Sequence, residues 1–368
     1  MVRLPEHIRD PLEKFVRRLS AKETVSGVGL FGSWSRDDAT SASDLDLLII
    51  DNRNFNCEYV DRISLKEELI DLNYVPRNWL SGRFPLEIDQ KLHEAYVLYD
   101  RDWSLTSTKD WLARVYRNSH RIDLRTEHYV VESDILLSKA FSAYQRNDVQ
   151  SACIFAEAAV EFIVKTFMEI NCMPISNSHF IKSLEESTVK LGMPHIFSTF
   201  LTVTRLSEVD HDEAERRLEL FKGVGDDLSS RMRKRRSLVD SLPFRVQANL
   251  KYYGDSNFLH GVVARTREIL TEERYIEASH YLLSSLFSIV ENYVPFISAW
   301  KGTKFSYAPF ISMMRSFEES AQMSSDIVAA FGLNGIDSRE ARELLRTAKE
   351  LTRDVRRWRK VLIDWFVK

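Results

Sequence analysis

The sequence predicts an α+β fold, in which an N-terminal mixed β-sheet domain with flanking helices precedes a large all-α region of one or two helical bundles. Short apolar runs between polar turns continue to about residue 105, which is typical of strands. From Thr108 onward, almost every segment instead repeats apolar residues at helical spacing. Only 12 glycines and 9 prolines occur among 368 residues, and this scarcity favours helices over loops.

These observations also predict domain boundaries. We expect the sheet domain at residues 1–107, a first helical bundle at 108–240 and a second helical bundle at 241–368. The stretch from Gly223 to Pro243 contains two glycines and is the expected linker between the bundles. Whether the helical region is one domain or two stays open at this point.

The sheet domain begins with a predicted amphipathic helix between Pro5 and Ser20, where apolar residues recur at helical spacing. Apolar runs then predict strands at residues 28–31, 44–50 and 69–75, and the later run 95–102 is a further candidate strand. The first of these strands runs into a Gly32-Ser33 turn, and Asp44-Leu45-Asp46 opens the second.

The helical region contains four long amphipathic patterns. They predict helices at residues 129–144, 148–170, 275–293 and 338–366. Asn147 or Asp148 is a candidate N-cap for the second of these helices, and Asp337 or Ser338 for the last. The first two helices are expected to form an antiparallel hairpin because only a short polar segment separates them.

The Asp44-Leu45-Asp46 sequence is the main candidate for chemistry. Strand side chains alternate between faces, so Asp44 and Asp46 point the same way. Two neighbouring carboxylates repel each other unless a cation lies between them. Mg²⁺ is typically held by one or two carboxylates together with substrate phosphates. The pair therefore predicts half of a metal site whose other half is a nucleoside triphosphate.

A two-metal site usually needs a third carboxylate. Asp71 is a lone acid in an otherwise apolar strand and is the first candidate. Asp61 is its rival, because residues 58–63 could form the partner strand of a hairpin that turns at Lys66-Glu67. Arg62 lies beside Asp61, which favours a solvated face for Asp61.

The Gly32-Ser33 turn is the candidate phosphate site. Gly32 lets the backbone approach a phosphate closely, and Ser33 adds a hydroxyl donor. A helix starting at Ser33–Arg36 would add free N–H groups to an anion site. Arg36 supplies a fixed positive charge for phosphate.

Composition narrows the class of protein. The net charge of −3 gives no general field for nucleic acid, although the basic cluster Arg231–Arg236 leaves a local patch open. The three cysteines show no metal-ligand spacing and favour a reducing compartment without a zinc site. Neither a signal peptide nor a long apolar span is recognised, so we expect a cytoplasmic protein without a membrane partner.

Phe31-Gly32-Ser33, Asp44-x-Asp46 and Asp71 occur in an order that resembles the nucleotidyltransferase superfamily with the DNA-polymerase-β-like fold. The similarity spans roughly residues 20–110 and is strongest to the minimal nucleotidyltransferases and aminoglycoside adenylyltransferases. The helical region resembles, in pattern only, the HEPN family and the C-terminal domain of kanamycin nucleotidyltransferase. Asp37 stands where the family motif often has glycine, and we expect Asp37 and Asp38 to be solvated.

The resemblance implies catalytic and metal-binding roles for Asp44, Asp46 and Asp71, and nucleotide-binding roles for Gly32, Ser33 and Arg36. It implies Mg²⁺ or Mn²⁺ as cofactor, a nucleoside triphosphate (ATP expected) as donor, and pyrophosphate release on transfer to a hydroxyl acceptor. The helical region would bind the acceptor, which is a small aminoglycoside-like molecule or a protein side chain.

Several alternatives stay open. A non-catalytic nucleotide-binding module, or an antitoxin-like regulatory one, could use the same fold. The resemblance to aminoglycoside adenylyltransferases implies that a glutamate of the helical region, Glu157 or Glu161, could act as a general base for the acceptor. Lys165 follows one turn after Glu161, and an ordinary salt-bridged helix face is the favoured interpretation. A homodimer is a further alternative that stays open.

Overall fold

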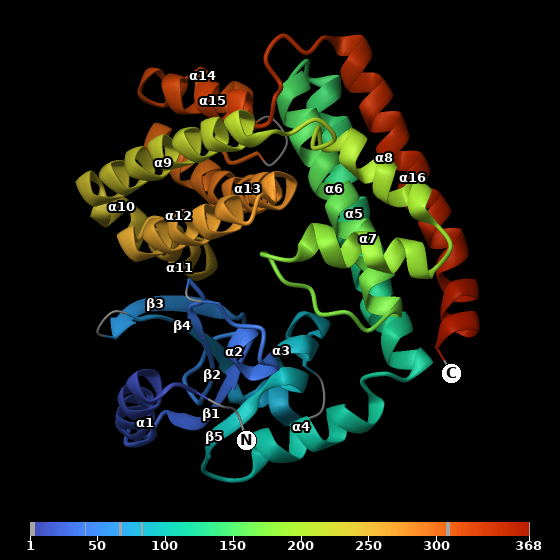
Figure 1. The fold of residues 1–368 in the computed structure, drawn as a ribbon. Coiled ribbons are helices and arrows are strands. Elements are labelled where there is room, and N and C mark those ends of the chain that lie inside the picture. Colours follow the sequence, from blue (N-terminus) through green and yellow to red (C-terminus); the bar gives the residue numbers. More distant parts are fainter. Residues whose placement is uncertain (1–3, 41, 66–67, 82–83, 307–309, 368) are drawn as a thin grey trace. The chain divides into compact units, whose positions relative to one another are not determined.

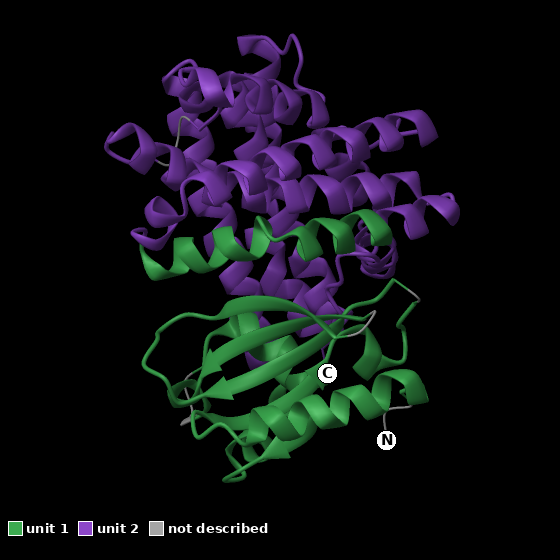
Figure 2. Ribbon diagram, turned by 90° about the vertical axis from the view of Figure 1, so that its left-hand side faces the viewer, with its two compact units in different colours: residues 1–118, 243–265 green, residues 119–242, 266–368 purple. Residues whose placement is uncertain are grey.

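A computed structural model describes residues 4–40, 42–65, 68–81, 84–306 and 310–367. The chain divides into two compact units (Figure 2). Unit 1 comprises residues 1–118 and 243–265, and unit 2 comprises residues 119–242 and 266–368. The expected boundaries at 107 and 240 lie near two of these divisions, but the segment 243–265 joins the sheet unit.

Unit 1 contains the only sheet in the described residues, and its strands are ordered β3-β4-β2-β1-β5 (Figure 1). The strands are β1 (Val25–Phe31), β2 (Leu45–Asp51), β3 (Tyr59–Leu65), β4 (Glu68–Pro76) and β5 (Tyr96–Asp100). The helices of this unit are α1 (Glu6–Ser20), α2 (Ser33–Arg36), η1 (Arg77–Ser81), η2 (Leu86–Ile88), α3 (Asp89–Glu94), α4 (Ser104–Val115) and α11 (Phe244–Tyr253). Helix α12 (Ser256–Thr271) belongs to unit 1 as far as Arg265.

The sheet is covered on both faces because its central strands are apolar on both sides. Leu47 and Ile49 of β2 pack with α1 on one face, whereas Leu48 and Ile50 pack with α3 and α4 on the other. All seven residues of β1 are buried. Nearly continuous apolar strands of this kind are expected when both faces are buried. The predicted α+β class, with its mixed sheet, is confirmed.

Strand pairing fixes which residues lie side by side. β2 and β4 are parallel, and Asp46 is the register partner of Asp71. β3 and β4 form an antiparallel hairpin that pairs Arg62 with Asp71. The predicted turn at Lys66-Glu67 lies outside the described residues, but the strands on either side of it pair as a hairpin requires.

All the regular secondary structure in the described residues of unit 2 is helical. Its helices are α5 (Ser119–Gln145), α6 (Val149–Ile170), α7 (Phe180–Lys190), α8 (Pro194–Val203), α9 (His211–Lys234), α10 (Arg236–Asp240), the end of α12, α13 (Tyr275–Lys301), α14 (Phe310–Arg315), α15 (Glu318–Ala330) and α16 (Ser338–Phe366). Helices α5, α6 and α16 pack against one another along their lengths (Figure 1). The expected α5–α6 hairpin is present.

Two predicted N-caps are confirmed. The Asp148 carboxylate accepts from the N–H of Ser151 at the start of α6. At the start of α16, the Asp337 side chain accepts from the N–H groups of Arg339 and Glu340, and Glu340 completes a capping box. These contacts satisfy N–H groups that the first turn of a helix leaves without intrahelical partners.

The predicted linker between Gly223 and Pro243 is wrong. Most of this stretch belongs to α9 and α10, and Val224 and Gly225 are buried. Glycine weakens a helix by about 1 kcal/mol relative to alanine, which packing of the helix readily offsets. Helix α9 packs against α13 and α15, so tertiary contacts decide the conformation of this stretch.

Helix α13 is long and apolar enough to cross a membrane by length and composition alone. Its Leu282, Leu286 and Tyr293 side chains are buried among the other helices of unit 2. The core helix of a globular unit passes the same length and composition test.

The basic cluster Arg231–Arg236 spans the end of α9 and the start of α10. Arg231 donates to Asp227 one helical turn earlier, and the Arg235 guanidinium lies 3.7 Å from the centre of the Trp300 ring. Two members of the cluster thus make contacts within unit 2.

Candidate functional site

The phosphate turn forms where β1 ends and α2 begins. Gly32 has φ 76° and ψ −154°, a conformation essentially confined to glycine. A Cβ added at Gly32 would collide with Oδ2 of Asp46. This position therefore requires glycine for its backbone conformation and for the close approach of the Asp46 carboxylate.

The three predicted acids lie together on one face of the sheet. Asp44 directly precedes β2, and Asp46 is its second residue, so both share a face. The parallel register places Asp71 of β4 beside Asp46. Asp61, the rival candidate, is exposed and precedes Arg62, whose side chain reaches the acids, so Asp61 projects from the opposite face of β3.

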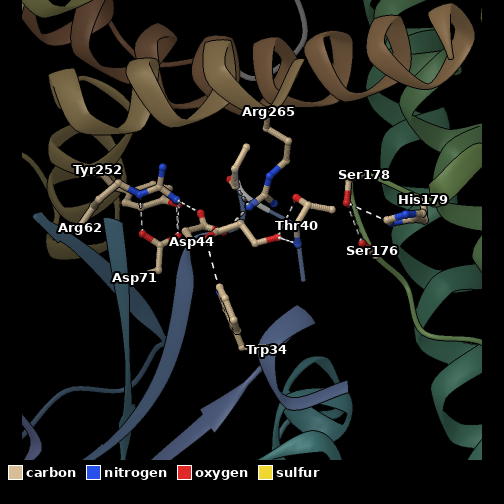
Figure 3. A network of polar contacts seen from close by, with 12 residues as sticks. Trp34, Thr40, Asp44, Arg62, Asp71, Ser176, Ser178, His179, Tyr252 and Arg265 are labelled. Atoms are coloured by element: carbon tan, nitrogen blue, oxygen red, sulfur yellow. Dashed lines mark hydrogen bonds and ion pairs between the residues drawn. The ribbon is translucent and has the colours of Figure 1, made fainter. Parts of the chain in front are cut away.

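Two arginines bind the acid cluster (Figure 3). Arg62 Nε donates to Oδ1 of Asp71 at 2.5 Å, and its Nη2 donates to Oδ2 of Asp71 at 2.6 Å and to Oδ2 of Asp44 at 2.5 Å. Arg265 of α12 donates through Nη2 to Oδ1 of Asp44 at 2.5 Å. The Tyr252 hydroxyl of α11 donates to Oδ2 of Asp71 at 2.8 Å.

Sequence reasoning missed Arg62, Tyr252 and Arg265. A signal existed for Arg62, because a hairpin turning at residues 66 and 67 places it opposite Asp71. No local pattern marks Tyr252 or Arg265, which contact the acids across sequence separations of 181 and 221 residues.

The two arginines affect the pKa values of the acids unequally. Burial alone would raise the pKa of Asp44, but the nearby Arg265 and Arg62 outweigh it and lower that pKa. Burial and the carboxylates of Asp44 and Asp71 raise the pKa of Asp46 well above its ordinary value. Asp46 therefore carries the least compensated carboxylate of the three.

Arg36 and the Gly32 N–H both donate to a carboxylate of the protein itself. Glu94 at the end of α3 accepts from the Gly32 N–H at 3.2 Å and from Nη1 of Arg36 at 2.6 Å. Gln90, one turn earlier, holds the other oxygen of Glu94 at 2.8 Å. A carboxylate thus lies where these donors would meet a phosphate oxygen. Ser33 is half-buried as the first residue of α2.

Asp37 and Asp38 follow this anion site and are exposed, as expected. Asp37 ends α2 in the left-handed conformation with φ 60°, and Asp38 accepts from Nε of Arg36 at 3.1 Å. Aspartate tolerates the left-handed region better than most residues. The left-handed conformation explains why glycine suits this position and why aspartate can replace it.

Known proteins share this region. A family model described as a nucleotidyltransferase domain matches residues 12–100, which include Gly32, Asp44, Asp46 and Asp71. A relative from Methanocaldococcus jannaschii, named a protein adenylyltransferase, is 32% identical over 94 residues, covering 24% of this chain and 83% of the relative. The chain belongs to the nucleotidyltransferase family.

A solved structure of a nucleotidyltransferase-like protein from Exiguobacterium sibiricum 255-15 matches 87% of this nucleotidyltransferase and 89% of its own chain. The two are 13% identical with a TM-score of 0.33, a similarity too low to relate their helical regions. Tyr252 and Arg265 lie outside the range that the family model matches.

The donor set of the nucleotidyltransferase site suits a hard divalent cation, because it consists of carboxylate oxygens and lies against the tight Gly32 turn. Within the described part of the chain, no three His, Cys, Asp or Glu side chains already converge as metal ligands. The guanidinium of Arg62 lies between Asp44 and Asp71 instead. Asp44 and Asp46 are the carboxylates that would hold a metal here, once the arginines on Asp44 give way.

Glu157 and Glu161 lie on α6 of unit 2 and are both engaged in ion pairs. Nζ of Lys165 lies 3.0 Å from Glu161, and Arg205 donates to Glu157. Both acids, with His280, line a cavity of about 30 Å³. The Glu161–Lys165 pair agrees with the salt-bridge interpretation, whereas Glu157 pairs with Arg205 and not with Lys165.

Proposed function

We propose that this enzyme transfers a nucleoside monophosphate from a nucleoside triphosphate to a hydroxyl acceptor and releases pyrophosphate. The observation that carries the proposal is the Gly32 turn against Asp46, with Asp44 and Asp71 on the same face of the sheet. A glycine turn beside carboxylates allows a triphosphate to approach a cation-binding cluster closely.

Each residue of the site has an expected task in the transfer. The Gly32 N–H and Arg36 would bind phosphate oxygens in place of the Glu94 carboxylate. Asp44 and Asp46 would hold Mg²⁺ or Mn²⁺, which when bound neutralises charge on the phosphates. Asp71 holds Arg62 and Tyr252 beside them.

The reaction forms one bond and breaks one. The acceptor oxygen attacks the α-phosphorus as the bond from that phosphorus to the bridging oxygen breaks, and pyrophosphate leaves with the electron pair. The acceptor hydroxyl loses its proton as the new bond forms, so a base must lie within hydrogen-bond reach. In-line positioning and charge stabilisation are the main contributions of the protein in reactions of this kind.

The name of the Methanocaldococcus relative favours AMP as the transferred group and a protein side chain as the acceptor. A small hydroxyl compound of the aminoglycoside type is the alternative acceptor. The relative aligns with only 24% of the chain, so most of the helical region is outside the match. The acceptor assignment is therefore best tested directly.

The test is to incubate the chain with Mg²⁺ or Mn²⁺, each nucleoside triphosphate labelled at the α-phosphate, and a cell extract as acceptor. We expect label from ATP to enter a product whose size distinguishes a protein from a small molecule. Asp46→Asn should abolish transfer, whereas the matched variant Asp61→Asn, altered at an exposed aspartate on the other face of β3, should retain it. Nucleotide binding without labelled product would favour the non-catalytic alternative.

A further inference from the structure

Arg62 is held in a site built for its guanidinium (Figure 3). Its side chain is 4% exposed, and Asp71 receives two of its hydrogen bonds. The Tyr252 and Phe258 rings each lie with their centres 5.5 Å from its Cζ. Aromatic faces attract cations, and desolvation strengthens that attraction.

Gly261 of α12 is a second, independent sign that Arg62 stays in place. A Cβ at Gly261 would lie 2.5 Å from Nη1 of Arg62 and 3.0 Å from Cδ1 of Leu69. Glycine is less favourable than alanine inside a helix. At this position, however, any side chain would displace the guanidinium. The helix therefore leaves room for Arg62 at a position where nothing in the helix itself calls for glycine.

Among the three aspartates, Asp71 accepts the largest number of the described side-chain hydrogen bonds. Arg62 binds both of its carboxylate oxygens, and Tyr252 donates to Oδ2 as well. Asp44 receives one arginine hydrogen bond on each oxygen, from Arg62 and from Arg265. Asp46 lies against Gly32, where phosphates would approach.

The charges of the cluster also set Asp71 apart from Asp44 and Asp46. Counted with all groups ionised, the carboxylates of Asp44, Asp46 and Asp71 exceed the guanidiniums of Arg62 and Arg265 by one negative charge. One divalent cation is attracted to such a cluster. A second cation next to Asp71 would meet the positive charge of Arg62 at close range in a poorly solvated site, where repulsion is strong.

We propose that Arg62 is a resident cation of the nucleotide site and takes the place that a second divalent ion would occupy at Asp71. The site then binds one divalent ion, at Asp44 and Asp46, and Asp71 is a positioning residue that anchors Arg62. This inference rests on the proposed function.

The test is to count Mn²⁺ bound to the full chain by electron paramagnetic resonance, with Mn²⁺ alone and with Mn²⁺ plus α,β-methylene-ATP, which cannot undergo the transfer. We expect one Mn²⁺ per chain under both conditions and a spectrum of isolated ions. Two ions in one site lie roughly 4 Å apart and give a spin-coupled spectrum. Two coupled ions in the unaltered protein would overturn the proposal.

The variant Arg62→Gln removes the resident charge and should raise the count from one Mn²⁺ to two, with coupling. Arg53→Gln is the matched control, because Arg53 pairs with Asp51 and Tyr59 away from the acid cluster, and the count should stay at one. Arg62→Gln that folds and still binds one ion would refute the charge argument. If it does not fold, Gly261→Ala tests the same point, since displacing Arg62 should also admit a second ion.

The outcomes separate this inference from the proposed function. One Mn²⁺ per chain without any binding of the nucleotide analogue would support the role of Arg62 and contradict nucleotide transfer. Nucleotide binding with two coupled ions would support transfer and contradict the role of Arg62.

Discussion

Arg62 and Asp71 face each other across the β3–β4 hairpin and share two parallel hydrogen bonds, from Nε at 2.5 Å and from Nη2 at 2.6 Å. Bidentate pairs of this kind are among the strongest hydrogen-bonded contacts in proteins. The register of the β3–β4 hairpin places Arg62 opposite Asp71. The same register therefore brings the positive charge of Arg62 to the acid cluster.

Gly32→Ala should weaken nucleotide binding by at least tenfold and lower the free energy of unfolding by roughly 1–3 kcal/mol. The alanine would strain the backbone and collide with Asp46. Gly192→Ala is the matched control, because Gly192 also has a positive φ (71°) but nothing lies within 4 Å of an added Cβ. Nucleotide titration and urea unfolding measure both effects, and equal behaviour of the two variants would contradict the prediction.

Tyr252→Phe should lower the free energy of unfolding by about 2 kcal/mol, since a buried hydrogen bond to a charged group is lost. Burial first, and then the negative charge of Asp71, raise the pKa of Tyr252, so its hydroxyl stays protonated and donates at neutral pH. Tyr96→Phe, at an exposed tyrosine of β5, should change stability little. Equal urea midpoints for the two variants would refute this role for the hydroxyl.

Glu157 should make the protein less stable as pH rises from about 4.5 to about 7. Burial raises the pKa of Glu157 to about 7, despite Arg205 and Arg217 nearby. The folded state then holds a proton that the unfolded state has lost, so the free energy of unfolding falls over this range, by up to about 3 kcal/mol. Glu157→Gln should remove that fall, as measured by urea unfolding at several pH values.

Glu161 provides the opposite case one turn away. Burial alone would raise its pKa, but Lys165 and His280 outweigh it and lower that pKa. Its contribution to stability is present above its unfolded pKa and is lost as pH falls. Glu161→Gln should therefore destabilise the protein at neutral pH. Parallel pH profiles for Glu157→Gln and the unaltered protein would contradict the assignment for Glu157.

Asp337→Ala should lower the free energy of unfolding by about 1 kcal/mol, because it removes the N-cap of α16. Faster amide exchange in the first turn of α16 would report the loss locally. Asp364→Ala, at an exposed position near the other end of the same helix, should leave exchange in that first turn unchanged. Unaltered exchange in Asp337→Ala would show that the capping box contributes little.

The elements that sequence predicted well depend on contacts within their own segment. Asp148 and Asp337 cap helices whose apolar spacing is visible locally, and Asp44 and Asp46 share a face because strand geometry requires it. The predicted linker between Gly223 and Pro243 was wrong because contacts with other segments determine the structure of this stretch. There, glycine content suggested a break, and packing of α9 against α13 and α15 overrode it.

The acid cluster was predicted in membership but not in its charge balance. Asp71 could be singled out because it is a lone acid in an otherwise apolar strand, and the parallel register of β2 and β4 places it beside Asp46. Tyr252 and Arg265 come from helices far along the chain, and contacts of such long range leave no periodic trace in a sequence. Gly261 was overlooked because the side chain that requires a glycine there, Arg62, belongs to a strand far away in the sequence.

The division of unit 1 into residues 1–118 and 243–265 has a consequence for synthesis on the ribosome. Asp44 emerges 221 residues before its partner Arg265. At roughly 5–20 residues per second, that interval lasts roughly 10–45 s. During this time Asp44 has Arg62 but not Arg265 as a partner, so the β3–β4 hairpin supplies the first of its two arginines.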